Sequence, residues 1–164
     1  MEDMRGFDRL QENLEGEDEM KGKVLSVNIS KDKGEKKHNI GRCRLIENKG
    51  LEADAHAGFM HRQVSLLSLD SIEKMREKRI NIEYGDFAEN LTTEGIDLLS
   101  LPVGTKLKVG DGVILRITQI GKQCHKGCAI FQQVGDCVMP REGIFAEVVT
   151  GGDVKIGDAI EVIE

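Results

Sequence analysis

The sequence feature that most constrains the fold is a pattern that occurs twice: an alternating strand, a Gly-Asp turn and a second strand. It is found at residues 107–113, LKVGDGV, and again at residues 154–160, VKIGDAI. Alternating apolar residues on both sides of a tight glycine-containing turn are typical of a β-hairpin. We therefore expect two similar hairpins in one sheet. A shared turn geometry explains the likeness as well as an internal duplication does.

Most other apolar segments are also short and have the spacing of strands. These segments are residues 23–30, 40–46, 64–69 and 144–149. One helix is expected to run to about residue 79, because Asp70 and Glu73 form a capping-box pattern and Ile72 and Met75 follow at helical spacing. Strands outnumber helices and turns are closely spaced. The sequence thus predicts a mainly β fold, a closed or partly closed β-barrel with one or two short helices.

Length and charge restrict the class of protein. The chain has 164 residues, enough for one core, and its net charge of -6 argues against a nucleic-acid-binding face. Residues 1–20 are acidic and have no sustained apolar period, so we expect a disordered leader followed by one domain over residues 21–164. No secretory signal and no membrane-spanning apolar run is visible. We expect a cytoplasmic protein with neither nucleic acid nor membrane as a partner.

Three of the four cysteines fall within residues 118–137, TQIGKQCHKGCAIFQQVGDC. Cys124 follows the strand-like run 113–117, where rigid backbone can hold a side chain that solvent still reaches. Lys122 and Lys126 place positive charge near it, which favours the nucleophilic, metal-binding thiolate. Cys124 is therefore the candidate reactive cysteine.

Two other uses of the cysteines stay open. A zinc or iron–sulfur site would use Cys124, Cys128 and Cys137, with Cys43 or His125 as the fourth ligand. The spacing lacks the two close pairs that are usual in structural zinc sites. Alternatively, Cys124 and Cys128 pair as a redox-active thiol couple. Cys43 lies on a predicted strand, and a packed core thiol is its expected state.

A second group of polar residues lies in and just after a loop of small residues, GLEADAHAG at 50–58. The group comprises Asp54, His56, His61 and Arg62. Histidine and arginine beside small residues bind phosphate through charge-assisted hydrogen bonds. The group is a candidate anion site, with an ordinary polar surface loop as the alternative.

Over roughly residues 21–164 these stretches resemble the MOSC family, the domain found at the C-terminus of molybdenum-cofactor sulfurases and as small stand-alone bacterial proteins. The resemblance rests on GLEADAHAG at 50–58, HRQVSLLS at 61–68, FAENLTTEGIDL at 87–98 and TQIGKQC at 118–124. Ala53 and Asp54 stand where the family usually has Gly-Asp. Residues 121–124, GKQC, stand where it usually has Arg-x-Pro-Cys.

The resemblance implies a mostly β barrel that binds the molybdenum cofactor (molybdopterin), a pterin with a phosphate and a dithiolene-held metal. It implies that Cys124 carries sulfur or ligates molybdenum. By the same match His56, Arg62 and Asn90 line the pocket, and Lys122 stands in for the missing arginine. These roles are expectations from the family likeness.

The implied partners are the free pterin cofactor or a molybdoenzyme, with a cysteine desulfurase as a possible sulfur donor. A sulfurase-like transfer of sulfur is the activity that the resemblance suggests. A zinc or iron–sulfur binding module and a thiol redox protein remain the alternatives.

Overall fold

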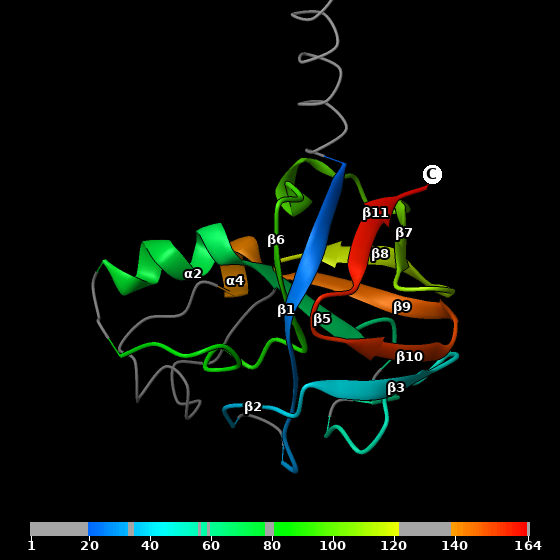
Figure 1. Cartoon of the computed structure of the whole chain (residues 1–164), viewed down its shortest axis with the longest axis horizontal. Coiled ribbons are helices and arrows are strands. Elements are labelled where there is room, and N and C mark those ends of the chain that lie inside the picture. The colour runs from blue at the N-terminus through cyan, green and yellow to red at the C-terminus, as the bar shows by residue number, and fades with distance from the viewer. Residues whose placement is uncertain are drawn as a thin grey trace, which may run out of the picture.

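The computed structural model describes residues 20–32, 35–55, 57–58, 60–77, 81–121 and 139–163. Figure 1 shows a strand-rich body with the helix α2 (Leu69–Arg76) on one side. Within these ranges no helix is both long and apolar enough to cross a membrane. Apart from Met20, the expected acidic leader lies outside the described residues.

Seven of the described strands close into a barrel. Their order is β11 (Ala159–Val162), β7 (Lys106–Val109), β8 (Val113–Ile120), β9 (Ile144–Thr150), β5 (Val64–Ser68), β6 (Leu91–Glu94) and β1 (Lys21–Ile29). Pairing of β1 with β11 closes the ring. β5 and β6 run parallel, the other neighbours run antiparallel, and the two-residue strand β2 (His38–Asn39) extends the sheet beyond β1. The mainly β barrel predicted from the short alternating segments is confirmed.

The main core fills the barrel because side chains alternate between its two faces. On β8, for example, Leu115 and Ile117 are fully buried while Arg116 between them is exposed and pairs with Glu147 of β9. A second apolar cluster lies around α2 and β5, outside that core. Its buried members are Leu67, Ile72, Met75, Ile82, Phe87, Ala88 and Phe145.

The second Gly-Asp segment does not form a hairpin, so that expectation is wrong. The strand before it, β10 (Gly152–Lys155), pairs with β3 (Arg42–Ile46) in a small sheet that also holds β4 (Gly50–Leu51), while β11 joins the barrel. The reason lies at the turn, where Gly157 N donates to Val24 O at 2.8 Å and Val24 N donates to Asp158 O at 2.9 Å. The turn is thus bonded to β1 and becomes a corner between two sheets. The first segment does form the expected hairpin, β7 with β8.

The predicted helix is present as α2, but its cap differs from the expected one. Ser68 is the N-cap, and its Oγ accepts from Ser71 N at 3.3 Å. Asp70 lies in the first turn instead, where a carboxylate suits the positive end of the helix dipole. The other described helical elements are the 3-10 turn η1 (Leu98–Ser100) and the four-residue α4 (Met139–Glu142).

Candidate functional site

The loop that ends at Arg62 lies against the end of strand β8. Thr118 Oγ1 donates to the backbone carbonyl of His61 at 2.6 Å, and His61 Nε2 lies 2.8 Å from Gln119 Oε1. These contacts join residues 57 and 58 positions apart in the chain. We call this region the rim, and it is the candidate site. It consists of His61, Arg62 and residues 118–121, which end β8 and include the residue after it.

Arg62 belongs to the rim and is half-buried. Its guanidinium carbon lies 5.8 Å from the centre of the Phe145 ring, which β9 supplies. An aromatic face under a guanidinium attracts and restrains the cation. The rim therefore holds a planar cation of the kind that recognises phosphate in a bidentate manner.

The two described stretches that flank residues 122–138 meet beside the rim. Gly121 N donates to Gly143 O at 2.7 Å, immediately after α4. Helix α4 is in turn tied to α2, because Ser71 Oγ donates to Glu142 Oε1 at 2.6 Å and Lys74 Nζ donates to Glu142 Oε2 at 3.0 Å. Both flanks of the cysteine-rich stretch are therefore fixed at the rim.

The Glu142 carboxylate is charged and well satisfied in this arrangement. Partial burial by itself raises its pKa, but the hydrogen bonds from Ser71 and Lys74 and the Lys74 charge hold the pKa below the usual 4.5. Both partners bind the charged carboxylate more strongly than they would a protonated carboxyl, because hydrogen bonds to an ionised acceptor are stronger. The tie between α2 and α4 is thus at full strength at neutral pH.

Three of the predicted site residues, His56, Lys122 and Cys124, lie outside the described residues, as do Cys128 and Cys137. Their expected roles stay predictions. Among the described residues, no group of three His, Cys, Asp or Glu side chains is placed to hold a metal ion. The zinc alternative depends on cysteines in the stretch that is not described.

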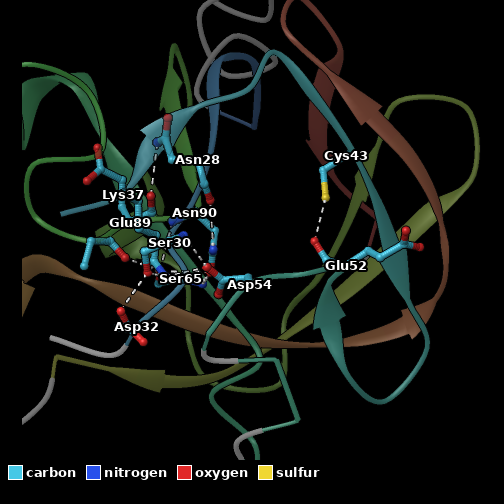
Figure 2. Close-up of polar contacts among 11 residues, drawn as sticks. Asn28, Ser30, Asp32, Lys37, Cys43, Glu52, Asp54, Ser65, Glu89 and Asn90 are labelled. Atoms are coloured by element: carbon cyan, nitrogen blue, oxygen red, sulfur yellow. Dashed lines mark hydrogen bonds and ion pairs between the residues drawn. The ribbon is translucent and has the colours of Figure 1, made fainter. Parts of the chain in front are cut away.

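Asn90, the other predicted pocket residue, lies inside a buried polar network (Figure 2). Its Oδ1 accepts from Ser65 N at 2.9 Å, and its Nδ2 donates to Asn28 O at 3.1 Å. Asn90 thereby fixes β5 three residues beyond Arg62 and joins it to β1. In this structure its amide holds strands together.

Asp54 was expected in the anion site with Arg62, but it faces a different set of groups. Lys37 Nζ donates to Asp54 Oδ1 at 2.7 Å, Ser30 N donates to the same oxygen at 3.0 Å, and both charged side chains are buried (Figure 2). Burial by itself raises the pKa of Asp54, yet the Lys37 bond and charge, with Ser30 and Asn90, bring the pKa below 3.8. Asp54 therefore fixes its loop to the barrel as half of a buried ion pair.

Sequence reasoning missed Glu89, the most deeply buried carboxyl of the described residues. Its Oε2 accepts from Gly85 N at 2.9 Å and from Thr92 Oγ1 at 2.8 Å. Its Oε1 and Asn28 Oδ1 are both buried without a hydrogen-bond partner. Burial raises the pKa of Glu89 despite these hydrogen bonds. No local pattern in the sequence marks this position, because its surroundings come from β1 and β6.

Cys43 is half-buried and packs against the main core, as expected for a structural thiol. Its Sγ donates to Glu52 O at 3.5 Å, away from the Asn90 network in Figure 2. Burial raises the pKa of this thiol above the usual 9.0. Cys43 is thus a poorly reactive cysteine.

Two surface clefts, each of about 420 Å³, lie beside Lys36 and the β2 residue His38. The described residues that line them do not include His61, Arg62 or Asn90. Their walls contain lysines, acidic side chains and Tyr84 with no unpartnered buried group. These clefts are separate from the rim.

Comparisons with known proteins point to one family. The sequence model of the MOSC domain matches residues 53–161, more than half of the chain. The structure is similar to the YuaD protein from Bacillus subtilis, with a TM-score of 0.72 and 20% identity over 87% of this chain and 96% of that one. It is also similar to YiiM from Geobacillus stearothermophilus, with a TM-score of 0.68 and 17% identity over 87% of this chain and 75% of that one. No curated protein matches the sequence.

Proposed function

The chain belongs to the MOSC domain family, and from that premise we propose that it binds a molybdenum-cofactor-type pterin at the rim. The family is linked to molybdenum-cofactor biology. In the proposed site Arg62 binds the phosphate of the cofactor, and Cys124 carries sulfur or ligates the metal. His56, Asn90 and Lys122 belong to the proposal through the family likeness.

One observation carries this proposal: the contacts of His61 with Thr118 and Gln119. They place the residue before Arg62 at the end of the strand that leads into Cys124. Cys124 is three residues beyond Gly121 in the sequence, a span of at most about 11 Å in extended chain. A cofactor with a phosphate at one end and sulfur-bound metal at the other needs an anion site and a thiolate within such a distance.

Arg62 of the rim and the proposed thiolate of Cys124 suit the chemistry of the proposed ligand. A planar guanidinium matches a phosphate through paired hydrogen bonds. Soft thiolate sulfur suits a soft metal and also suits the storage of sulfur as a persulfide. The cofactor supplies the metal centre when bound, and the chain supplies the anchoring cation and the thiol.

The proposal is tested by equilibrium binding of the molybdenum cofactor, released from a donor molybdoenzyme, to purified variants. Arg62→Ala removes a charge-assisted contact of about 1.5–3 kcal/mol and should weaken binding about tenfold or more. Arg42→Ala is the matched control, because Arg42 is an exposed arginine on β3 and should bind like the wild type. Equal affinities for Arg62→Ala and wild type would remove the rim from the proposal.

Sulfur transfer is proposed for the same cysteine. A cysteine desulfurase is the proposed donor, and the bound cofactor or a molybdoenzyme is the acceptor. Incubation with a desulfurase and cysteine should add the mass of one sulfur atom to the peptide that contains Cys124, and Cys124→Ser should lose it. Labelling of another cysteine instead would contradict this assignment. Cys124→Ser should leave phosphate binding intact.

A further inference from the structure

The side chain of Gln119 fixes the direction of the hydrogen bonds around His61. Its Nε2 lies 2.7 Å from the carbonyl oxygen of Gly121, and its Oε1 lies 2.8 Å from His61 Nε2. A carbonyl oxygen only accepts, so the amide nitrogen must face Gly121 and the amide oxygen must face His61. An amide oxygen also only accepts, and His61 Nε2 therefore carries a hydrogen.

The acid–base and acceptor chemistry of His61 is thus confined to its other ring nitrogen, Nδ1. With Nε2–H committed to Gln119, the neutral ring has its single lone pair at Nδ1. His61 is exposed, and the bond from Thr118 Oγ1 to its backbone carbonyl holds the residue on β8. The rim therefore presents a fixed acceptor to solvent.

We propose that His61 is a ligand-binding residue of the rim, which presents Nδ1 as a hydrogen-bond acceptor beside the cation of Arg62. The rim then selects a ligand that combines an anionic group with an N–H or O–H donor. A phosphorylated pterin has this combination, in its phosphate and in the amino and N–H groups of its ring. This inference rests on the proposed function and adds to it the chemical class that the rim selects.

The positioning part of the inference is tested without any ligand. Long-range proton–nitrogen correlation spectra of the free protein, recorded in alkaline solution where the imidazole is neutral, should show His61 with hydrogen on Nε2 alone. Gln119→Leu removes the acceptor and should give a mixture of the two tautomers. A wild-type ring with hydrogen on Nδ1 would overturn the inference.

The recognition part is tested with two probes, pterin-6-carboxylate and inorganic phosphate, the second measured by competition. His61→Ala should weaken the binding of pterin-6-carboxylate about two- to tenfold, the usual range for one neutral hydrogen bond, and leave the binding of phosphate unchanged. Gln119→Leu should also weaken the binding of pterin-6-carboxylate, and Arg62→Ala should weaken the binding of both probes. His38→Ala is the matched control, since His38 is an exposed histidine on β2.

The outcomes separate the two proposals. Wild-type protein that binds neither probe overturns the proposed function and this inference together. This inference alone is overturned if the wild type binds both probes and His61→Ala binds them with the same affinity. It is also overturned if His61→Ala loses equal affinity for the two probes. The backbone bond from Thr118 survives in His61→Ala, so the fold of the rim is retained.

Discussion

At the scale of single residues, Glu89 shows how the barrel places a carboxyl where its charge is costly. Two acceptor oxygens, Glu89 Oε1 and Asn28 Oδ1, are buried without partners in one polar cluster. Gly85 N and Thr92 Oγ1 donate to the other carboxyl oxygen, Glu89 Oε2, and the Asn28 side chain lies against Gly85. A proton on Glu89 would turn one acceptor into a donor, because a protonated carboxyl has an O–H. We expect Glu89 to be neutral in the folded protein.

Glu89→Gln tests this expectation, because an amide copies the donor and acceptor pattern of a protonated carboxyl. We expect its free energy of unfolding to stay within about 1 kcal/mol of the wild type near pH 5. Glu89→Leu leaves two donors, Gly85 N–H and the Thr92 hydroxyl hydrogen, without the acceptor that Glu89 Oε2 provides, and should cost about 1–3 kcal/mol for each. Urea unfolding of the three proteins measures both effects.

The same carboxyl predicts a pH dependence. The folded pKa of Glu89 is raised above 4.5, so its stabilising contribution is full below pH 4.5 and is lost as pH rises through the folded pKa. Wild-type stability should therefore fall relative to Glu89→Gln as pH rises. Asp54 acts in the opposite direction, because its pKa is below 3.8 and its contribution is lost in acid. Parallel pH profiles for wild type and Glu89→Gln would show that Glu89 is ionised in the fold.

At the scale of elements, α4 has only four residues and depends on its tie to α2. The Ser71 hydroxyl is buried and donates to a charged oxygen, a bond worth about 1.5–3 kcal/mol. Lys74 reaches the same carboxylate from solvent, where an ion pair is worth about 0–1 kcal/mol. Ser71→Ala should therefore destabilise the protein more than Lys74→Ala in urea unfolding.

The tie should also weaken in acid. The pKa of Glu142 is below 4.5, so its contribution is present above that value and is lost as pH falls through the folded pKa. The difference between wild type and Ser71→Ala should shrink over that range. A larger loss for Lys74→Ala than for Ser71→Ala would contradict this account of the tie.

The sequence predicted the elements better than it predicted their partners. Strands such as β7 and β8 follow from local alternation, which decides which side chains face a core. The Gly-Asp turn at Gly157 is also local, but whether its two flanking strands pair depends on Val24, more than 130 residues earlier in the chain. The turn of the first Gly-Asp segment is also bonded to a distant strand, since Gly110 N donates to Ala159 O at 2.8 Å, but its flanking strands β7 and β8 still pair with each other.

The candidate site was foreseeable only in part. The types of Arg62 and His61 suggested an anion site, and the place of Cys124 after a strand and among lysines suggested a reactive thiol. The contact of His61 with Gln119 comes from the pairing of β5 and β8 with β9, and nothing in either local sequence encodes it. The burial of Asp54 with Lys37 was equally invisible, since a loop aspartate and a loop lysine are usually both exposed.

At the scale of the whole molecule, the barrel gathers three distant stretches at one place. Residues 61–62, 118–121 and 141–145 meet through the contact of His61 with Gln119 and the bond from Gly121 N to Gly143 O. Figure 1 shows α4 beside α2, which agrees with the tie between them. This convergence is the basis for our proposal that an anion site and a thiol belong to one binding site.

The most direct test of the proposed shared site is protection of Cys124 from alkylation. Limiting iodoacetamide near pH 7, with mass mapping of each cysteine, should label Cys124 first in the free protein. Cys43 should react slowly and serve as the internal reference, since burial raises its pKa. Saturating molybdenum cofactor should slow labelling of Cys124 about tenfold or more, and Arg62→Ala should need about tenfold more cofactor for the same protection. Labelling of Cys124 at the same rate with and without bound cofactor would contradict the account.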